Sequence, residues 1–171
     1  MNKTRVEIVA GNQLLYTIYN SPVGKLLLAG DQDALQSIQF EYSINPAKSW
    51  IENRSAFNKA IAQLDQYFKG DRTTFDLPLN PQGTLFQKSV WNQLEKIPFG
   101  QTKYYGQIAQ EIGNPKASRA IGMANNKNPI PIIIPCHRVI GKNGSLTGFA
   151  GGLTIKQQLL DLEFKHFSFR I

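Results

Sequence analysis

The sequence predicts an α+β protein built in two parts. Residues 1–80 are expected to form a small antiparallel sheet covered by one helix, and residues 81–171 a helical domain that contains a helix-turn-helix. Short apolar runs separated by turn residues predict the sheet, and apolar residues at helical spacing predict the helices. A stretch of Pro, Asn and Gly at residues 77–83 predicts the linker between the two parts.

Three strands and one helix are expected in the first half. Residues 14–19 and 24–29 are apolar runs, and residues 34–40 return as a third strand after a Gly-Asp turn. The helix is indicated by apolar residues three and four positions apart, namely Phe57, Ile61, Leu64 and Phe68. Gly70 is expected to end it. Nothing in this half suggests chemistry, so we expect a supporting domain.

Two helices are expected next. The first begins with a capping box made by Thr84 and Gln87 and runs to about Ile97, before Pro98 stops it. The second begins near Tyr105 and ends at Gly113.

A third short helix follows, for which Asn114 and Pro115 are typical N-cap and first-turn residues. Its buried face is expected to be Ala117, Ala120, Ile121 and Ala124. Its outward face carries Lys116, Ser118, Arg119 and Met123. Two short helices joined by a tight turn indicate a helix-turn-helix, although two helices packed on a core give the same pattern.

The only cysteine, Cys136, lies at the end of a Pro- and Ile-rich segment. Three prolines between residues 128 and 140 exclude a helix and predict a stiff, extended chain with a buried Ile run. Asn143 and Gly144 then predict a tight hairpin.

A last helix is expected to open with a capping box at Thr154 and Gln157 and to bury Ile155, Leu159 and Leu162. Glu163 falls at the edge of that apolar stripe, where it is either a partly buried carboxylate in need of a partner or an exposed one.

Composition excludes several classes of protein. One cysteine allows no intrachain disulfide, and two histidines besides cannot complete a Cys/His zinc site. The apolar runs are too short to cross a bilayer, and the N-terminus lacks the apolar core of a signal peptide. We therefore expect a soluble monomer of a reducing cytoplasm, with no metal, no cofactor and no membrane contact.

The net charge of +7 comes from the second half of the chain. Residues 1–80 hold eight basic and eight acidic side chains, whereas residues 81–171 hold eleven basic and four acidic ones. This bias favours a polyanionic partner, with a generally basic, solvated surface as the alternative.

A lone cysteine is most often a small core residue. Here Arg138 follows Cys136 within two residues, in the basic half of the chain, and a nearby cation stabilises the thiolate that attacks electrophiles. Adjacent His137 is a weaker signal, because neighbouring residues rarely point at each other. These features allow a reactive thiol without specifying its reaction.

The motifs around Cys136 closely resemble the active-site region of O6-alkylguanine-DNA alkyltransferases. The strings that carry the resemblance are Pro135-Cys136-His137-Arg138-Val139, Asn128-Pro129 before it, Gly151-Gly152-Leu153 after it, and residues 105–109 and 113–122 upstream. It covers residues 84–163 strongly and the first 80 residues only in general layout. It implies a ribonuclease-H-like first domain and a winged helix-turn-helix in the second.

The resemblance also implies a function. The protein would repair double-stranded DNA by moving a methyl or other alkyl group irreversibly from guanine O6 to Cys136, one lesion per molecule, with O4-alkylthymine as a further candidate substrate. By the same resemblance, His137 acts through a water as the base, Glu163 holds its tautomer, and Tyr105 donates a hydrogen bond to the purine. Arg119 fills the space left by the flipped base.

Further roles follow from the same resemblance. Lys116, Ala117 and Ser118 would lie with Arg119 against the DNA minor groove. The hinge and walls of the substrate pocket would be Asn128, Pro131, Arg138, Val139, Ala150 and Gly151. Two positions depart from the family pattern: Tyr104 replaces a common Ser or Thr, and Phe149 replaces a common Tyr.

Two other functions are also compatible with the sequence. A helix-turn-helix protein could bind lesions or regulate genes with Cys136 inert, in which case lesion DNA would leave its mass unchanged. A cysteine hydrolase would turn over an acyl substrate, but the only histidine apart from His137 is His166, near the C-terminus.

Overall fold

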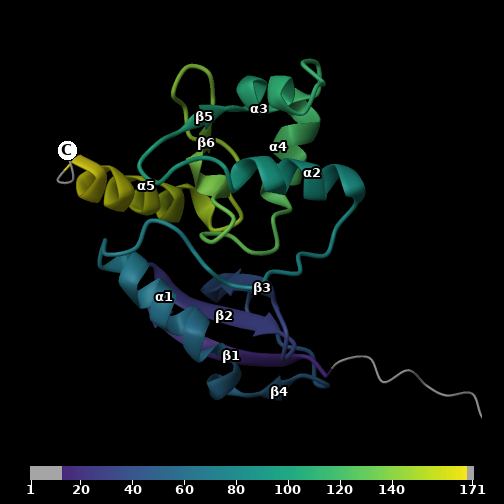
Figure 1. The fold of residues 1–171 in the computed structure, drawn as a ribbon, viewed down its shortest axis with the longest axis vertical. Coiled ribbons are helices and arrows are strands. Elements are labelled where there is room, and N and C mark those ends of the chain that lie inside the picture. Colours follow the sequence, from purple (N-terminus) through teal and green to yellow (C-terminus); the bar gives the residue numbers. More distant parts are fainter. Residues whose placement is uncertain (1–12, 169–171) are drawn as a thin grey trace, which may run out of the picture.

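A computed structural model describes residues 13–168 as two packed layers, a sheet with its helix and a group of helices above it (Figure 1). The strands β1 (Leu15–Ser21), β2 (Gly24–Gly30) and β3 (Leu35–Phe40) are antiparallel, as predicted. The sheet has the order β3-β2-β1-β4, and the two-residue strand β4 (Ile51–Glu52) runs parallel to β1. The expectation of a purely antiparallel sheet was therefore wrong at this edge, because two residues are too few to give a strand pattern.

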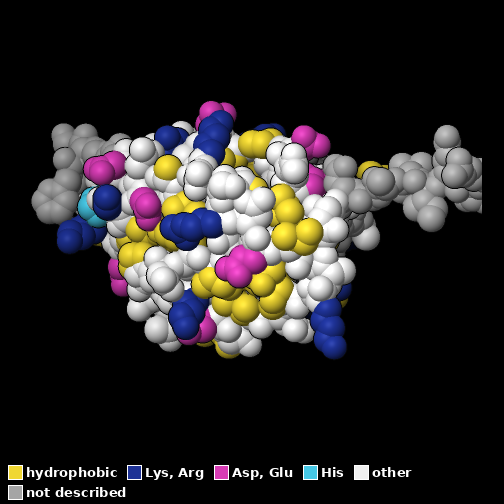
Figure 2. All heavy atoms as spheres, turned by 90° about the horizontal axis from the view of Figure 1, so that it is seen from below, with side chains coloured by type: hydrophobic (Ala, Val, Ile, Leu, Met, Phe, Trp, Pro, Cys, Tyr) yellow, Lys and Arg dark blue, Asp and Glu magenta, His cyan; other side chains and the backbone are white. Residues whose placement is uncertain are grey.

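Helix α1 (Asn58–Phe68) covers one face of this sheet, and the predicted helix is confirmed (Figure 1). It follows the short 3₁₀ turn Arg54–Phe57, and another 3₁₀ turn, Glu41–Ser43, follows β3. The central strand β2 buries Leu26, Leu27 and Leu28 completely. The opposite end of the molecule from the helical layer carries basic and acidic side chains intermixed around apolar ones, as expected for a half with balanced charge (Figure 2).

The outer edge of β3, the last strand at that end of the sheet, is hydrogen-bonded to the linker and to the helical layer. Its Leu35 N–H donates to the carbonyl of Pro78 in the linker at 3.0 Å, and its Ile38 N–H donates to the carbonyl of Pro129 at 2.8 Å. Phe40 at the end of β3 packs edge-on against Phe149, with ring centroids 5.5 Å apart. The segment that leads to Cys136 is thus held directly by the sheet.

The predicted capping box begins α2 (Leu85–Leu94): Gln87 N–H donates to Thr84 Oγ1 at 3.2 Å, and Thr84 N–H donates to Gln87 Oε1 at 2.8 Å. The helix ends at Leu94, three residues before the predicted end. Ile97 N–H still donates to the Leu94 carbonyl, but in a turn that buries the Ile97 side chain.

Helices α3 (Tyr105–Glu111) and α4 (Ser118–Asn126) form the predicted helix-turn-helix, with Gly113 at φ +75° in the turn. Two details were wrong. The helix α4 begins at Ser118 rather than at Asn114, because Asn114 accepts from the Ala117 N–H in a turn that precedes the helix. Ala120 is exposed, and the buried residues of α4 are Ile121, Ala124 and Asn125.

The segment before Cys136 is buried as predicted but is not extended throughout. Ile134 N–H donates to the Ile130 carbonyl at 2.9 Å, which closes a turn in which Ile132 adopts φ 76°. A left-handed conformation is rare for a β-branched residue, and nothing in the sequence indicates it. Cys136 then begins the 3₁₀ turn η3 (Cys136–Arg138).

The strand β6 (Val139–Ile140) follows η3 and pairs in parallel with β5 (Lys103–Tyr104). Residues 141–144 form the predicted turn, but the residues after it make no strand, so the hairpin was wrong. The last helix, α5 (Gly152–Ser168), begins two residues before Thr154 and therefore has no capping box at Thr154 and Gln157. No helix within residues 13–168 is long and apolar enough to cross a membrane.

Candidate functional site

The tight turn η3 places three functional side chains in the core. Cys136, His137 and Arg138 are 1%, 0% and 5% exposed. The turn is closed by the Arg138 N–H, which donates to the Pro135 carbonyl at 3.0 Å. With three residues per turn, successive side chains of a 3₁₀ turn point in different directions. Cys136 and His137 can therefore belong to one buried site without their side chains facing each other.

Glu163 of α5 is the centre of a buried hydrogen-bond network. Its Oε1 accepts from His137 Nε2 at 2.7 Å, and Arg138 donates to both carboxylate oxygens at 2.9 Å. The Gly100 N–H donates to Oε2 at 3.1 Å. Burial opposes ionisation, but His137 and Arg138 outweigh it and hold the pKa of Glu163 well below its usual range.

An ionised Glu163 fixes the tautomer of His137. A carboxylate can only accept, so Nε2 carries the proton and Nδ1 is an acceptor. Nδ1 is buried and has no hydrogen-bond partner within the described residues. Burial lowers the pKa of His137 despite the opposing effect of Glu163, so the ring is neutral near pH 7 and Nδ1 is free to take a proton.

The resting state of Cys136 is a thiol. Burial raises its pKa to about 11, against hydrogen bonding by Asn128 and the charge of Lys156, which both favour the thiolate. A base must therefore remove the proton before the sulfur can attack.

Lys156 of α5 connects β6, which follows Cys136, to the loop that contains Thr147. Its fully buried ammonium group donates to the Val139 carbonyl at 2.6 Å and to the Thr147 carbonyl at 2.8 Å. The Tyr105 hydroxyl donates to the same Thr147 carbonyl at 3.2 Å. Tyr105 is thus linked to Lys156 through the Thr147 carbonyl, whereas Tyr104 is 39% exposed, with its N–H bonded to Gln107 Oε1.

Asn128 holds the chain that precedes Cys136. Its Nδ2 donates to the Ile134 carbonyl at 2.8 Å and its Oδ1 accepts from the Ile130 N–H at 3.0 Å, so it bonds to both ends of the turn that contains Pro131. From α4, Asn125 Nδ2 donates to the Cys136 carbonyl at 3.3 Å. The helix-turn-helix is therefore bonded to the cysteine turn.

The glycine loop lies where the layers meet. Ala150 is exposed and Gly151 is buried. A Cβ on Gly151 would lie 2.5 Å from the Phe149 ring and 2.9 Å from the Phe40 ring, so only glycine fits between them.

The predicted DNA-contacting residues lie in the first turn of α4 and in the two residues before it. Lys116 and Arg119 are exposed, and Ala117 and Ser118 are half-buried. Met123, one turn after Arg119, is 64% exposed.

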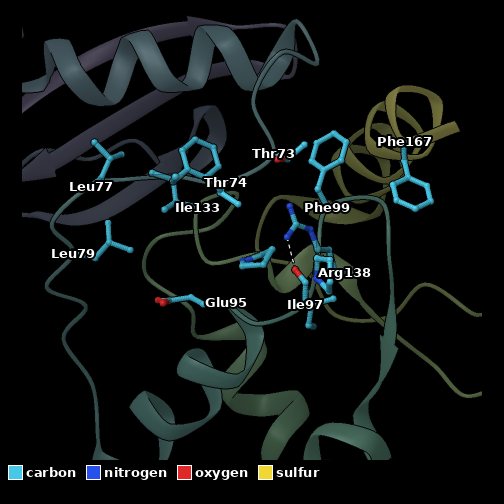
Figure 3. A pocket seen from close by; sticks show the side chains of 13 residues that line it. Thr73, Thr74, Leu77, Leu79, Glu95, Ile97, Phe99, Ile133, Arg138 and Phe167 are labelled. Carbon is cyan, nitrogen blue, oxygen red and sulfur yellow. Dashed lines mark hydrogen bonds between the residues drawn. The ribbon is translucent and has the colours of Figure 1, made fainter. Parts of the chain in front are cut away.

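Arg138 was expected to line the substrate pocket, but its guanidinium lies against Ile97 and Phe99 instead. Its Nη1 donates to the Ile97 carbonyl at 2.6 Å, and its guanidinium lies 5.9 Å from the centre of the Phe99 ring (Figure 3). It lines a cavity of about 620 Å³ whose walls include neither Cys136 nor Tyr105. Arg138 is thus placed to hold Glu163.

Sequence reasoning missed three residues of the cluster: Tyr67, Asn125 and Lys156. Tyr67 comes from α1, on the other side of the linker, and its hydroxyl donates to Glu163 Oε1 at 2.7 Å. Lys156 shares a helical face with Leu159 and Glu163, a spacing that could have indicated it. Within the described residues, no three His, Cys, Asp or Glu side chains are placed to hold a metal ion.

Comparison with known proteins identifies the family. Residues 85–165 match the model for the DNA-binding domain of 6-O-methylguanine DNA methyltransferase, and residues 14–81 match the model for its ribonuclease-like domain. The chain is 56% identical over 153 residues to the methylated-DNA–protein-cysteine methyltransferase of Methanosarcina acetivorans, covering 88% of this chain and 98% of that one. This chain belongs to the 6-O-methylguanine DNA methyltransferase family.

Solved structures agree with this membership. The O6-methylguanine methyltransferase of Mycobacterium tuberculosis has a TM-score of 0.85 and 46% identity, over 90% of this chain and 94% of that chain. The M. tuberculosis OGT crystallised in complex with DNA also has a TM-score of 0.85, at 45% identity, over 89% of this chain and 94% of that one. The resemblance noted in the motifs around Cys136 is thus confirmed for both layers of the methyltransferase fold.

Proposed function

We propose that this protein repairs DNA directly by moving an alkyl group from guanine O6 to the sulfur of Cys136. The observation that carries this proposal is the pairing of His137 with an ionised Glu163, which leaves Nδ1 as a buried acceptor on the residue that follows a buried, protonated Cys136. The names of the M. acetivorans and M. tuberculosis relatives support the same reaction.

The first step is loss of the thiol proton. His137 Nδ1 takes the proton from Cys136 through an intervening water, and Glu163 stabilises the imidazolium that forms. Asn128 and Lys156 favour the thiolate, since each lowers the pKa of Cys136 against the effect of burial.

The second step is an in-line displacement. A bond forms between sulfur and the alkyl carbon, and the carbon–O6 bond breaks with its electron pair on guanine. The proton taken from the thiol neutralises the guanine. The product is a thioether, which water does not hydrolyse under mild conditions, so each molecule reacts once.

The remaining site residues would bind the substrate. Tyr105 donates a hydrogen bond to the purine, and the backbone at Val139 and Ala150 recognises the guanine edge. Asn128, Pro131 and Gly151 fix the shape of the pocket.

The exposed beginning of α4 would bind duplex DNA. A base inside the duplex cannot reach a buried sulfur, so the alkylated guanine must leave the stack. Arg119 would fill the vacated space, and Lys116 and Ser118 would contact phosphates or sugars with Ala117 close to the backbone. We further propose that the protein acts as a monomer without metal or cofactor, in the reducing cytoplasm that a free acceptor thiol requires.

The test is the intact mass of the protein after incubation with a duplex that contains one O6-methylguanine. We expect a gain of one methylene mass per molecule, located on Cys136 and absent from Cys136→Ser. Tight binding of lesion DNA without a mass change would contradict transfer and favour a damage-binding protein. Repeated turnover of an acyl substrate would favour a hydrolase.

A further inference from the structure

The sheet layer contributes a side chain to the acceptor site. Tyr67 of α1 is fully buried, and its hydroxyl donates to Glu163 Oε1 at 2.7 Å across 96 residues of sequence. The aromatic rings of Phe68, Phe75 and Phe99 surround it, with centroids 5.3, 5.5 and 6.0 Å away. This packing fixes the ring, so the hydroxyl cannot turn away from the carboxylate.

Tyr67 and His137 donate to the same carboxylate oxygen. Oε1 accepts from the Tyr67 hydroxyl, from His137 Nε2 and from Arg138, whereas Oε2 accepts from Arg138 and from the Gly100 N–H. Donors on one oxygen share its negative charge, so a bond from Tyr67 weakens the hold of that oxygen on the His137 proton.

From this shared oxygen we infer that Tyr67 is a positioning residue of the acceptor reaction, which tunes how readily His137 accepts the thiol proton by acting through Glu163. The inference rests on the proposed function. The other ionisable groups that face His137 and Glu163 are Cys136 and Arg138 of η3 and Lys156 of α5, and a substitution of Tyr67 leaves all three in place.

The sign of the effect follows from the shared oxygen. Without the tyrosine hydroxyl, Oε1 keeps more charge and stabilises the imidazolium more strongly, so the pKa of His137 rises. A protonated His137 cannot accept the thiol proton. The acidic limb of the rate profile must therefore move to higher pH when the hydroxyl is removed.

The chain offers a matched control. Tyr19 is also buried and also donates to a carboxylate, Asp65 Oδ1, at 2.7 Å. This pair joins β1 to α1 within the sheet layer. Tyr19→Phe therefore removes a tyrosine–carboxylate hydrogen bond of the same length without changing the contacts of Glu163 and His137.

The experiment measures alkyl transfer from free O6-benzylguanine to the full chain between pH 5 and 9. We expect the acidic limb of Tyr67→Phe to lie about half to one pH unit above that of the wild type, which lowers the rate about three- to tenfold on that limb. Tyr19→Phe should follow the wild-type profile. Thermal melting and circular dichroism of each variant report folding.

A second variant keeps the test decisive if Tyr67→Phe folds poorly. Incorporating 3-fluorotyrosine at position 67 retains the ring and makes the hydroxyl a stronger donor, so the limb should move to lower pH. A limb that stays at the wild-type position in both variants, or one that moves equally in Tyr19→Phe, would overturn the inference. Failure of the wild type itself to become alkylated would instead overturn the proposed function.

Discussion

The second half of the chain contains two groups of charged side chains, one exposed to solvent and one buried. Lys116, just before α4, and Arg119, in its first turn, are exposed to solvent. Around Cys136, by contrast, Arg138, Lys156 and Glu163 are buried and hydrogen-bonded. Exposed charges add little to stability but attract phosphates, whereas buried charges are costly unless their partners are held in place.

This difference separates binding from chemistry. Substitutions on α4 should change how the protein engages DNA, and substitutions in the buried cluster should change how Cys136 reacts with any alkyl donor. A small donor such as free O6-benzylguanine needs no duplex and therefore distinguishes the two regions.

The largest effect is expected from Glu163→Gln. The variant loses the charge that fixes the His137 tautomer, so transfer to Cys136 should slow by about 10²- to 10⁴-fold on both donors. It also leaves Arg138 buried without a counter-ion, which should reduce the free energy of unfolding by about 3–5 kcal/mol. Single-turnover kinetics and urea denaturation measure the two effects.

Glu111→Gln is the matched control, since Glu111 pairs with Lys103 at a more exposed position. It should cost about 0–1 kcal/mol and leave the rate unchanged. Similar losses in the two variants would contradict a special role for the buried carboxylate.

The pH dependence of stability sharpens the same contrast. The folded-state pKa of Glu163 lies below its unfolded value, so its contribution is fully present above about pH 5 and is lost as the pH falls towards the folded value. The pKa of His137 is lowered too, so its contribution is lost as the pH falls below about 6.5. Unfolding free energy should therefore fall below about pH 6.5 through His137, and the additional fall below about pH 5 that comes from Glu163 should be absent from Glu163→Gln. Equal slopes would show that this carboxylate does not control acid sensitivity.

A smaller effect, confined to duplex substrate, is expected from Arg119→Ala. If Arg119 fills the space of the flipped base, transfer from an O6-methylguanine duplex should slow about tenfold, or about 1.4 kcal/mol, because the extruded state is less stable. Transfer from free O6-benzylguanine should be unchanged, since it needs no extrusion. Equal losses on both donors would remove Arg119 from this role.

The smallest effect is expected from Lys116→Ala. An exposed lysine that meets one phosphate should change duplex affinity a few-fold and lower the slope of log affinity against log salt by about 0.9. Fluorescence anisotropy at several salt concentrations measures both quantities. An unaltered slope would place Lys116 away from the phosphates.

The sequence predicted those features that depend on local patterns. The three antiparallel strands, α1, the Thr84 capping box and the helix-turn-helix all follow from spacing and turn residues within a few positions. The motif around Cys136 indicated the family because its residues are contiguous. The resemblance also implied that Glu163, 27 residues after Cys136, holds His137, whereas the bonds that Glu163 accepts from Arg138 and Gly100 came only from the structure.

Features decided by distant packing could not be predicted. Tyr67 lies on α1, and its bond to Glu163 depends on how the two layers meet, which no local pattern indicates. The left-handed Ile132 has no local signal, because glycine or asparagine is the usual occupant of that conformation. A lysine is usually exposed, and Lys156 is buried because the distant carbonyls of Val139 and Thr147 accept from its ammonium group.

The most direct measurement compares one ratio in two variants: the rate constant for alkyl transfer from the O6-methylguanine duplex, divided by that from free O6-benzylguanine. Separate regions for binding and chemistry predict a ratio about tenfold below wild type in Arg119→Ala and within about twofold of wild type in Glu163→Gln, where both rates fall together. An unchanged ratio in Arg119→Ala, or a loss confined to the duplex in Glu163→Gln, would contradict that separation.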